Sequence, residues 1–338
     1  MAIHSDQTQV TRRGALRSLA IGGAGMLLVD PSASFAQPAT PAVADSSLQG
    51  AGFFTFRHGE ATVSVVSDGG FVMKAGDVFP KVPKAELDEV AKSAHVSPDG
   101  FPGQINTLLI RRGNDVILID TGSGRNFGPT AGLLLPNLSR AGVAPADVTH
   151  VVLSHAHPDH VGGLLTADGK PTFARAKVFV NKAEHDFWTG PDPQMPDALV
   201  GADFKSMVIA AAKKAFAGVE GSLELLKPDD TVAGVVKLID APGHTPGHVA
   251  LRVGAADGPH LMYLGDALFI LPLQLKHLDW HAAYDADPVA AALTRRKLLE
   301  TAAENGTLAT AAHLPYPSLG YFDRDGDGFR WTARAWTW

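Results

Sequence analysis

The chain has 338 residues, of which 45% are hydrophobic, so it is long enough to bury a full core without crosslinks. Its formal net charge is −6 and it has no long basic run, which excludes the charge pattern of a nucleic-acid-binding or anionic-membrane-binding protein. It contains no cysteine, which excludes disulfides, thiolate metal sites and cysteine nucleophiles. Any metal ion must therefore be held by His, Asp or Glu, and neutral substrates are compatible with the charge.

The first segment predicts an export signal rather than part of a folded domain. Arg12 and Arg13 precede an apolar run over residues 18–29, and residues 34–36 supply the small side chains that a signal peptidase prefers. The run is too short to span a bilayer core of roughly 30 Å. Residues 1–36 thus resemble a twin-arginine signal peptide, whose removal would leave a periplasmic or secreted protein without a membrane anchor. The alternative is a chance pair of arginines before a short anchor.

Residues 37–50 are rich in Ala, Pro and Ser, which indicates a flexible lead into one domain over residues 51–338. Within this domain, short β-branched or aliphatic runs that end at Gly, Asp or Pro are predicted as strands. They are Thr62–Ser67, Gln104–Arg111, Val116–Asp120, Val148–Leu153, Lys177–Asn181, Val235–Asp240, His248–Val253 and His260–Leu264. Segments with apolar residues at helical spacing are predicted as helices. They are Lys84–Ala94, Thr130–Ala141, Lys182–Trp188, Asp203–Ala217 and Pro288–Ala303.

Local signals define some element ends. Asp287 is the expected cap of the last helix, with Pro288 in its first turn and residues 305–306 closing it. Residues 323–328 resemble the start of a calcium-binding loop, but Arg334 stands where the closing Glu is expected, so an Asp-Gly hairpin turn is the better interpretation. Two strand-rich blocks, each accompanied by helices, predict an α/β fold, a four-layer αββα sandwich with helices on the outer faces of two packed sheets.

One segment directly after a predicted strand crowds four potential metal ligands onto one turn. His155 and His157 are placed to aim at one ion, and Asp159 and His160, beyond the bend at Pro158, at a second. Without a cation, three imidazoles and a carboxylate so close together would repel one another or stay unsatisfied. Nitrogen and oxygen ligands without thiolates suit Zn²⁺, Mn²⁺, Co²⁺ or Fe²⁺.

The segment resembles the His-x-His-x-Asp-His signature of the metallo-β-lactamase superfamily, and other parts of the domain fit the same pattern. Residues 120–122 form an Asp-Thr-Gly turn after a strand, and His244 lies in a Gly-His-Thr-Pro-Gly-His run. Asp266 ends a later strand, and His313 precedes Leu-Pro. The resemblance covers nearly the whole domain and implies the metallo-β-lactamase fold with two divalent ions per chain, Zn²⁺ being the expected metal.

The ligands implied by the resemblance fall into two sets that share Asp266 as a bridge. The sets are His155, His157 and His244 for one ion, and Asp159, His160 and His313 for the other. Asp266 and Asp159 are the implied catalytic residues, because a water shared by two ions loses its proton easily: even one Zn²⁺ lowers its pKa to roughly 7 from near 15.7. Asp120 is expected to orient a ligand, and His248 to be a structural partner.

Within the superfamily, several aromatic segments look most like methyl parathion hydrolase and its lactonase or arylesterase relatives. By position, Phe127, Trp188 and Phe269 are expected to wall the substrate pocket, although each of them alternatively packs in the core. His277 or His281 is a further candidate for the pocket wall. An apolar pocket above two metal ions favours a neutral aryl ester, lactone or organophosphate triester. The same resemblance implies a homodimer.

One departure from the lactonase pattern sets the order of the functional hypotheses. Acyl-homoserine lactonases of this fold typically carry a Tyr three residues after the bridging Asp, where this chain has Phe269, which has no hydrogen bond to donate. Acyl-homoserine lactone opening is therefore the second enzyme hypothesis. A non-catalytic periplasmic binding module is the third, and the complete ligand set disfavours it.

Overall fold

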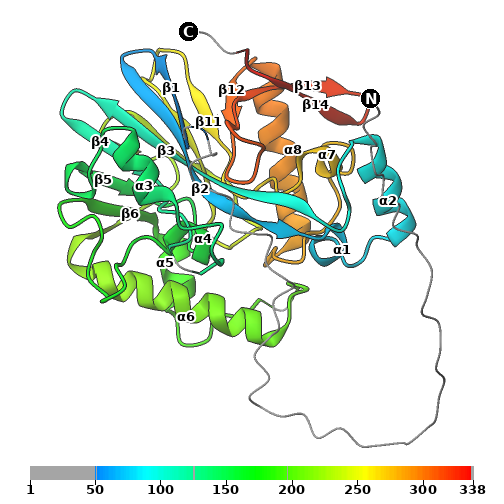
Figure 1. The fold of residues 1–338 in the computed structure, drawn as a ribbon, viewed down its shortest axis with the longest axis horizontal. Helices are drawn as coiled ribbons and strands as arrows, with labels where there is room; N and C mark the ends of the chain where they lie inside the picture. Colours follow the sequence, from blue (N-terminus) through cyan, green and yellow to red (C-terminus); the bar gives the residue numbers. More distant parts are fainter. Residues whose placement is uncertain (1–49, 51, 125, 196, 336–338) are drawn as a thin grey trace, which may run out of the picture. The chain divides into compact units, whose positions relative to one another are not determined.

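Two seven-stranded sheets packed face to face form the centre of the computed structural model, which describes residues 50, 52–124, 126–195 and 197–335 (Figure 1). These residues belong to one compact unit, Val43–Trp338. The predicted signal peptide and the lead up to residue 49 lie outside the described residues. Among the described helices, none combines the length and apolar character needed to span a bilayer.

The first sheet runs in chain order from β1 to β7, and the second in the order β14-β13-β12-β11-β10-β9-β8. The strands of the first sheet are β1 (Phe53–His58), β2 (Ala61–Met73), β3 (Phe101–Arg112), β4 (Asp115–Ile119), β5 (His150–Val152), β6 (Lys177–Asn181) and β7 (Leu223–Leu226). Those of the second are β8 (Thr231–Val232), β9 (Val236–Asp240), β10 (Val249–Val253), β11 (Leu261–Tyr263), β12 (Leu308–Thr310), β13 (Gly320–Asp325) and β14 (Gly328–Ala333).

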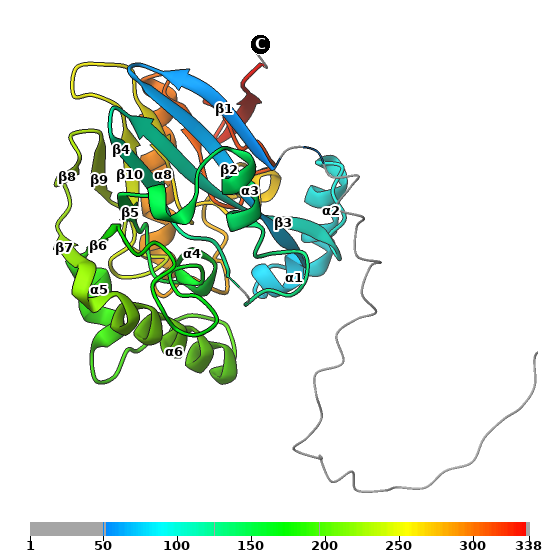
Figure 2. The ribbon, with the colours of Figure 1, turned by 60° about the vertical axis from the view of Figure 1, so that its left-hand side comes forward.

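Helices connect the parallel pairs and cover the outer faces. Strands β4 to β7 are parallel, as are β11 and β12, and such pairs need long crossovers. The helices are α1 (Ala75–Val78), α2 (Lys84–Ser93), α3 (Leu134–Arg140), α4 (Pro158–Val161), α5 (Lys182–Thr189), α6 (Ala202–Val219), α7 (Leu271–Gln274) and α8 (Pro288–Glu304). Figures 1 and 2 show α3, α5 and α6 on the side of the first sheet and α8 on the side of the second.

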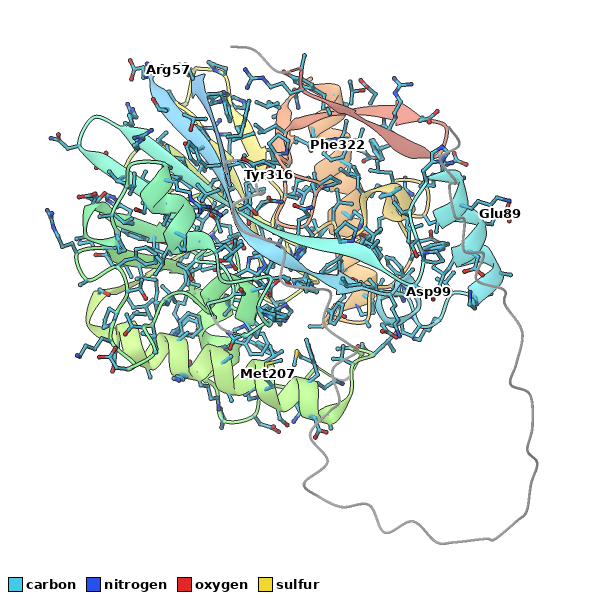
Figure 3. All side chains as sticks on the ribbon, in the orientation of Figure 1. Arg57, Glu89, Asp99, Met207, Tyr316 and Phe322 are labelled. Carbon is cyan, nitrogen blue, oxygen red and sulfur yellow. The ribbon has the colours of Figure 1, made fainter. Side chains whose placement is uncertain are left out.

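Side chains alternate between the two faces of each sheet, because the repeat of a strand is two residues. In β3, Leu108 and Ile110 join the core between the sheets, whereas Leu109 joins the core beneath α3 and α6. In β10, Leu251 belongs to the core between the sheets and Ala250 to the core beneath α8. Side chains fill these layers (Figure 3). The predicted four-layer αββα sandwich is therefore confirmed.

The observed elements match most of the predicted ones. Every predicted strand overlaps an observed strand, and β6 has the predicted bounds. Asp287 caps α8 by accepting a 2.9 Å hydrogen bond from the backbone N–H of Ala290. The Asp-Gly turn joins β13 to β14. The helix expected from Thr130 begins only at Leu134, because Gly132 has a positive φ of 78° and interrupts the helical backbone.

The core between the sheets predicts a large cost for removing one of its side chains. Leu251 is fully buried, so Leu251→Ala should lower the free energy of unfolding by about 2–5 kcal/mol through lost burial and a cavity. Leu225→Ala on β7 is the control, because Leu225 is 42% exposed. Urea unfolding followed by circular dichroism measures both. Equal costs for the two variants would contradict the assignment of Leu251 to the central core.

Candidate metal centre

The sequence after β5 turns sharply, and this turn positions four predicted ligands. His155 and His157 lie in the loop that leaves the strand, and His157 occupies the position before α4 in an extended conformation. Pro158 begins α4, where its fixed φ suits the first helical turn and its missing N–H costs nothing. Asp159 and His160 therefore project from the helix, one turn beyond the two loop histidines.

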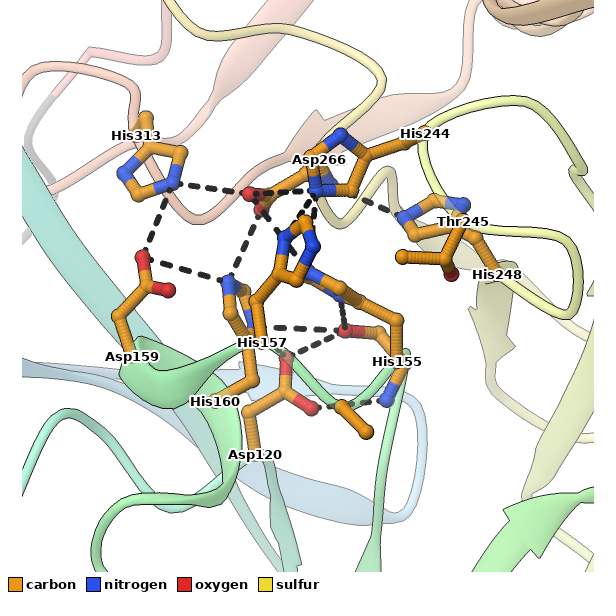
Figure 4. Close-up of polar contacts among 12 residues, drawn as sticks. Asp120, His155, His157, Asp159, His160, His244, Thr245, His248, Asp266 and His313 are labelled. Carbon is orange, nitrogen blue, oxygen red and sulfur yellow. Dashed lines mark hydrogen bonds and ion pairs between the residues drawn. The ribbon is translucent and has the colours of Figure 1, made fainter. Parts of the chain in front are cut away.

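The remaining predicted ligands also follow strand ends. His244 lies between β9 and β10, Asp266 follows β11, and His313 follows β12. The structure brings all the predicted ligands together at one place (Figure 4). They form a first donor group of His155, His157, His244 and Asp266 and a second donor group of Asp159, His160, Asp266 and His313, and the donor atoms within each group lie within 4.8 Å of one another.

The first donor group is nitrogen-rich. The Nε2 atom of His244 lies 2.8 Å from Nδ1 of His157 and 3.1 Å from Nε2 of His155. Oδ2 of Asp266 lies 3.5 Å from Nε2 of His244 and 3.8 Å from Nε2 of His155. Burial, reinforced by the neighbouring imidazoles, holds the pKa of each of the three histidines well below its usual range. They are therefore neutral, which is the form that binds a metal ion.

The second donor group has more negative charge. Oδ1 of Asp266 lies 3.1 Å from Nε2 of His160, and Nε2 of His313 lies 3.0 Å from Oδ2 of Asp266 and 3.4 Å from Oδ2 of Asp159. Burial alone would lower the pKa of both histidines. The carboxylates outweigh it, led by that of Asp266, and raise the pKa of His160 well above its usual range and that of His313 to about 9. This group therefore favours a positive charge at its centre.

The donor set fits two divalent ions. Ligands of a tetrahedral Zn²⁺ at 2.0–2.1 Å are separated by roughly 3.3 Å, which is similar to the donor spacings above. Two of the donor atoms, Nε2 of His160 and Oδ1 of Asp266, are buried and face each other, but neither has a hydrogen-bond partner among the described residues. Unpaired buried polar atoms are costly unless a cation binds them. The set contains no thiolate, so its chemistry does not distinguish zinc from manganese, cobalt or iron.

Outer hydrogen bonds fix the orientation of individual ligands, as sequence analysis expects for Asp120 and His248. Oδ2 of Asp120 accepts from Nδ1 of His160 at 2.8 Å. His248 is not a ligand: its Nε2 accepts a 3.1 Å hydrogen bond from the backbone N–H of Asp266. His313 donates from Nδ1 to the backbone oxygen of Gln104 at 2.6 Å. Each contact leaves the other ring nitrogen or carboxylate directed at the donor groups.

Two further supporting residues were not singled out by sequence analysis. Asn106 on β3 donates from Nδ2 to the backbone oxygens of Ala312 and Leu314, which hold His313 from both sides. Asp285 accepts from Nδ1 of His244 at 3.0 Å. Burial raises the pKa of Asp285 to about 7, and the nearby buried Arg295 opposes this rise.

Glu184 is the most connected of the residues that sequence analysis missed. Its Oε1 accepts from the backbone N–H of Ala156 at 2.8 Å and from the indole N–H of Trp188 at 2.6 Å. Its Oε2 accepts from the hydroxyl of Thr245 at 2.6 Å and from the backbone N–H of Gly247 at 3.0 Å. Ala156 lies between the two loop histidines, and Thr245 follows His244. One buried carboxylate thus joins the two loops that carry the nitrogen ligands of the first donor group.

An aromatic cavity opens over both donor groups. The described residues that line it are Phe71, Met73, Phe127, His157, Pro158, Asp159, Phe204, His244, Asp266, Phe269, Tyr284 and His313. Phe127 and Phe269, predicted for the pocket wall, line this cavity. Phe204 and Tyr284 were not predicted, although Tyr284 lies in residues 280–288, one of the aromatic segments that carry the resemblance. Trp188 does not line the cavity. It is fully buried, donates to Glu184 and packs edge-on behind His157, with ring centroids 5.7 Å apart.

The two histidines considered for the pocket wall lie elsewhere. Neither His277 nor His281 is among the described residues that line the cavity. His277 stacks on Trp280 instead, with ring centroids 4.1 Å apart and an interplanar angle of 13°. The cavity wall is therefore aromatic and aliphatic apart from the donor groups and Tyr284.

Comparison with known proteins identifies the family. Residues 100–313, more than half of the chain, match the sequence profile of the metallo-beta-lactamase superfamily. The chain belongs to the metallo-β-lactamase superfamily. The matched segment includes every member of both donor groups.

Similar members of the superfamily include two curated proteins. Metallo-beta-lactamase domain-containing protein 1 of Xenopus laevis is 29% identical over 179 residues, which are 52% of this chain and 62% of that protein. N-acyl homoserine lactonase AttM of Agrobacterium fabrum is 29% identical over 135 residues, which are 38% of this chain and 45% of that protein. The chain thus spans less than two thirds of the length of these curated relatives.

Two solved structures are similar over most of the superfamily fold. AidC, described as a dizinc quorum-quenching lactonase, is 29% identical with a TM-score of 0.81, and the match covers 85% of this chain and 98% of AidC. The hydrolase AbOPH is also 29% identical, with a TM-score of 0.77 and coverage of 86% of this chain and 99% of its own.

The four hydrogen bonds that Glu184 accepts predict a specific effect on the first donor group. Glu184→Gln replaces an acceptor oxygen by an amide NH₂ that faces two donors, so the loops should separate. We expect the first donor group to lose about 10- to 100-fold in metal affinity, the usual cost of losing an outer partner of a ligand. Chelator competition with metal analysis measures this. Glu224→Gln, at a surface ion pair with Lys177, is the matched control, and equal affinities in both variants would contradict the role of Glu184.

Proposed function

We propose that this protein is a dinuclear metal-dependent hydrolase of neutral aryl esters, lactones or organophosphate triesters. The observation that carries the proposal is an aromatic cavity directly over two adjoining donor groups. None of the described residues that line the cavity is Lys or Arg, so nothing in the wall compensates an anionic substrate. Apolar walls around a few convergent polar groups are typical of sites for small neutral molecules.

The chemistry divides between the bound ions and the chain. Two divalent ions, when bound, supply an ionised water at neutral pH and polarise the oxygen of the scissile group. Oδ1 of Asp266 faces His160 of the second donor group, and Oδ2 faces His244 of the first group and His313 of the second, so this one carboxylate links the two groups. Phe269 lies over His244 and His313, with ring centroids at 5.1 Å and 5.6 Å, and excludes water from above them. A dry site strengthens the electrostatic interactions of the developing charge.

Acyl-homoserine lactone opening is the second candidate, and the similarity to AttM and AidC supports it. The description of AidC as a dizinc enzyme likewise supports zinc as the native metal. The twin-arginine-like segment over residues 1–36 supports a periplasmic or secreted location. A binding module without catalysis is disfavoured, because the chain retains both complete donor groups.

A substrate panel on zinc-loaded protein tests the first candidate against the second. We expect turnover of paraoxon-type triesters or of dihydrocoumarin, since the cavity suits neutral aromatic substrates, and slower turnover of acyl-homoserine lactones. Initial rates and metal content, measured on the same preparations, provide the comparison. Activity on acyl-homoserine lactones alone would reverse this order, and no activity on any of them would refute the hydrolase proposal.

The shared position of the Asp266 carboxylate predicts what happens when the link between the two donor groups is broken. Asp266→Asn leaves one carbonyl oxygen where the wild type has two carboxylate oxygens that face the donor groups. Turnover should fall by more than about a hundredfold, since the loss of even an outer partner of a ligand lowers metal affinity or activity 10- to 100-fold. Circular dichroism should show a folded protein, and metal analysis fewer than two equivalents. Asp323→Asn, on the surface of β13, is the control. Unchanged activity in Asp266→Asn would refute its role as the shared ligand.

A further inference from the structure

Tyr284 is a polar side chain of the cavity wall that belongs to neither donor group. It is half-buried, and its ring packs between Phe269 and Phe204, with centroid distances of 6.0 Å and 5.5 Å. No described protein group hydrogen-bonds its hydroxyl. A polar group in an apolar wall is costly unless a ligand or water satisfies it. The hydroxyl is therefore available to a bound molecule.

The rest of the described cavity wall offers no competing donor. Apart from members of the donor groups and Tyr284, the lining residues are Phe71, Met73, Phe127, Pro158, Phe204 and Phe269. None of these side chains carries a hydrogen-bond donor. Burial, together with the charges of Asp77 and Asp159, raises the pKa of Tyr284, so its hydroxyl stays protonated and donates.

Tyr284 lies one aromatic ring away from the candidate metal centre. The ring centroid of Phe269 lies 5.1 Å from that of His244 and 5.6 Å from that of His313. The ring of Tyr284 packs against Phe269 at 6.0 Å and against Phe204 on α6 at 5.5 Å. A scissile bond must lie close to the donor groups to react. A substrate that also reaches Tyr284 therefore does so with a different part of the molecule.

We propose that the Tyr284 hydroxyl determines substrate specificity by donating a hydrogen bond to an acceptor oxygen that the substrate carries outside its scissile ester bond. This inference rests on the proposed hydrolase function and deepens it. The matching substrate class is a neutral ester or lactone with a second carbonyl, such as an amide substituent beside the lactone ring. A site built to hydrogen-bond one substrate group discriminates against analogues that lack it more strongly than an apolar wall does.

A matched pair of lactones tests the inference. One is N-hexanoyl homoserine lactone, and the other carries an alkyl chain of equal length in place of the amide-linked chain. Tyr284→Phe removes only the hydroxyl, so the preference for the amide-bearing lactone, as a ratio of kcat/KM values, should fall roughly 3- to 10-fold, mainly through KM. Tyr321→Phe is the control, because Tyr321 lies on β13 and does not line this cavity, and it should keep the wild-type ratio.

The same comparison is repeated as binding, by calorimetry on zinc-loaded protein with the hydrolysis-resistant lactam analogues of both lactones. If the wild type hydrolyses neither these lactones nor the paraoxon-type triesters and dihydrocoumarin of the substrate panel, the proposed function fails, but a fall in lactam preference on Tyr284→Phe still supports the inference. An unchanged ratio in both kinetics and binding overturns it. An equal loss on both substrates, confined to kcat, also overturns it, because the hydroxyl would then act on the scissile group.

Discussion

The whole centre depends on one shared carboxylate in a buried cluster of imidazoles. Asp266 directs Oδ1 at His160 and Oδ2 at His244 and His313, so its position sets the distance between the two donor groups. Its backbone N–H is held by His248, and the preceding Gly265 adopts a φ of 55° in which a Cβ would meet Nε2 of His248 at 2.4 Å. Only glycine fits there, because that contact leaves no space for a side chain.

The fold makes this arrangement rigid by holding several ligands, and the segments that carry others, from a second direction. Contacts cross from one sheet to the other: Asn106 on the first sheet holds the segment of His313 on the second, and Glu184 on α5 joins the loop after β5 to the loop before β10. Hydrogen bonds in a buried, low-dielectric interior are stronger than in water, so these contacts hold the ligand-bearing segments firmly. The ligand geometry is therefore a property of the packed sandwich rather than of any one loop.

The sequence predicts the elements and residues whose signals are local. The His-x-His-x-Asp-His segment, the predicted strands and the caps of α8 depend on neighbours in the chain. Strand β12 has only three residues and pairs with β11 through the long α8 crossover, so no local pattern marks it. Glu184 looks like a polar position of a surface helix, and Trp188 like a pocket aromatic; both are buried only because α5 packs against the loop of His157. Such roles depend on tertiary contacts.

The donor groups and the cavity wall have separate roles, and this separation explains how one kind of metal centre can act on different substrates in proteins of the same fold. Two ions bound by these ligands would act on any polarised ester or phosphoryl group, so the ligands by themselves would confer little selectivity. We infer that selectivity comes from the wall, where Phe269 packs over two ligands without a hydrogen-bonding group and Tyr284 places a hydroxyl beside it. A hydroxyl that lies one aromatic ring further from the donor groups requires a substrate whose acceptor oxygen lies equally far from its scissile bond. In the proposed role of Tyr284, the donor groups stay the same and the wall determines which part of a substrate is recognised.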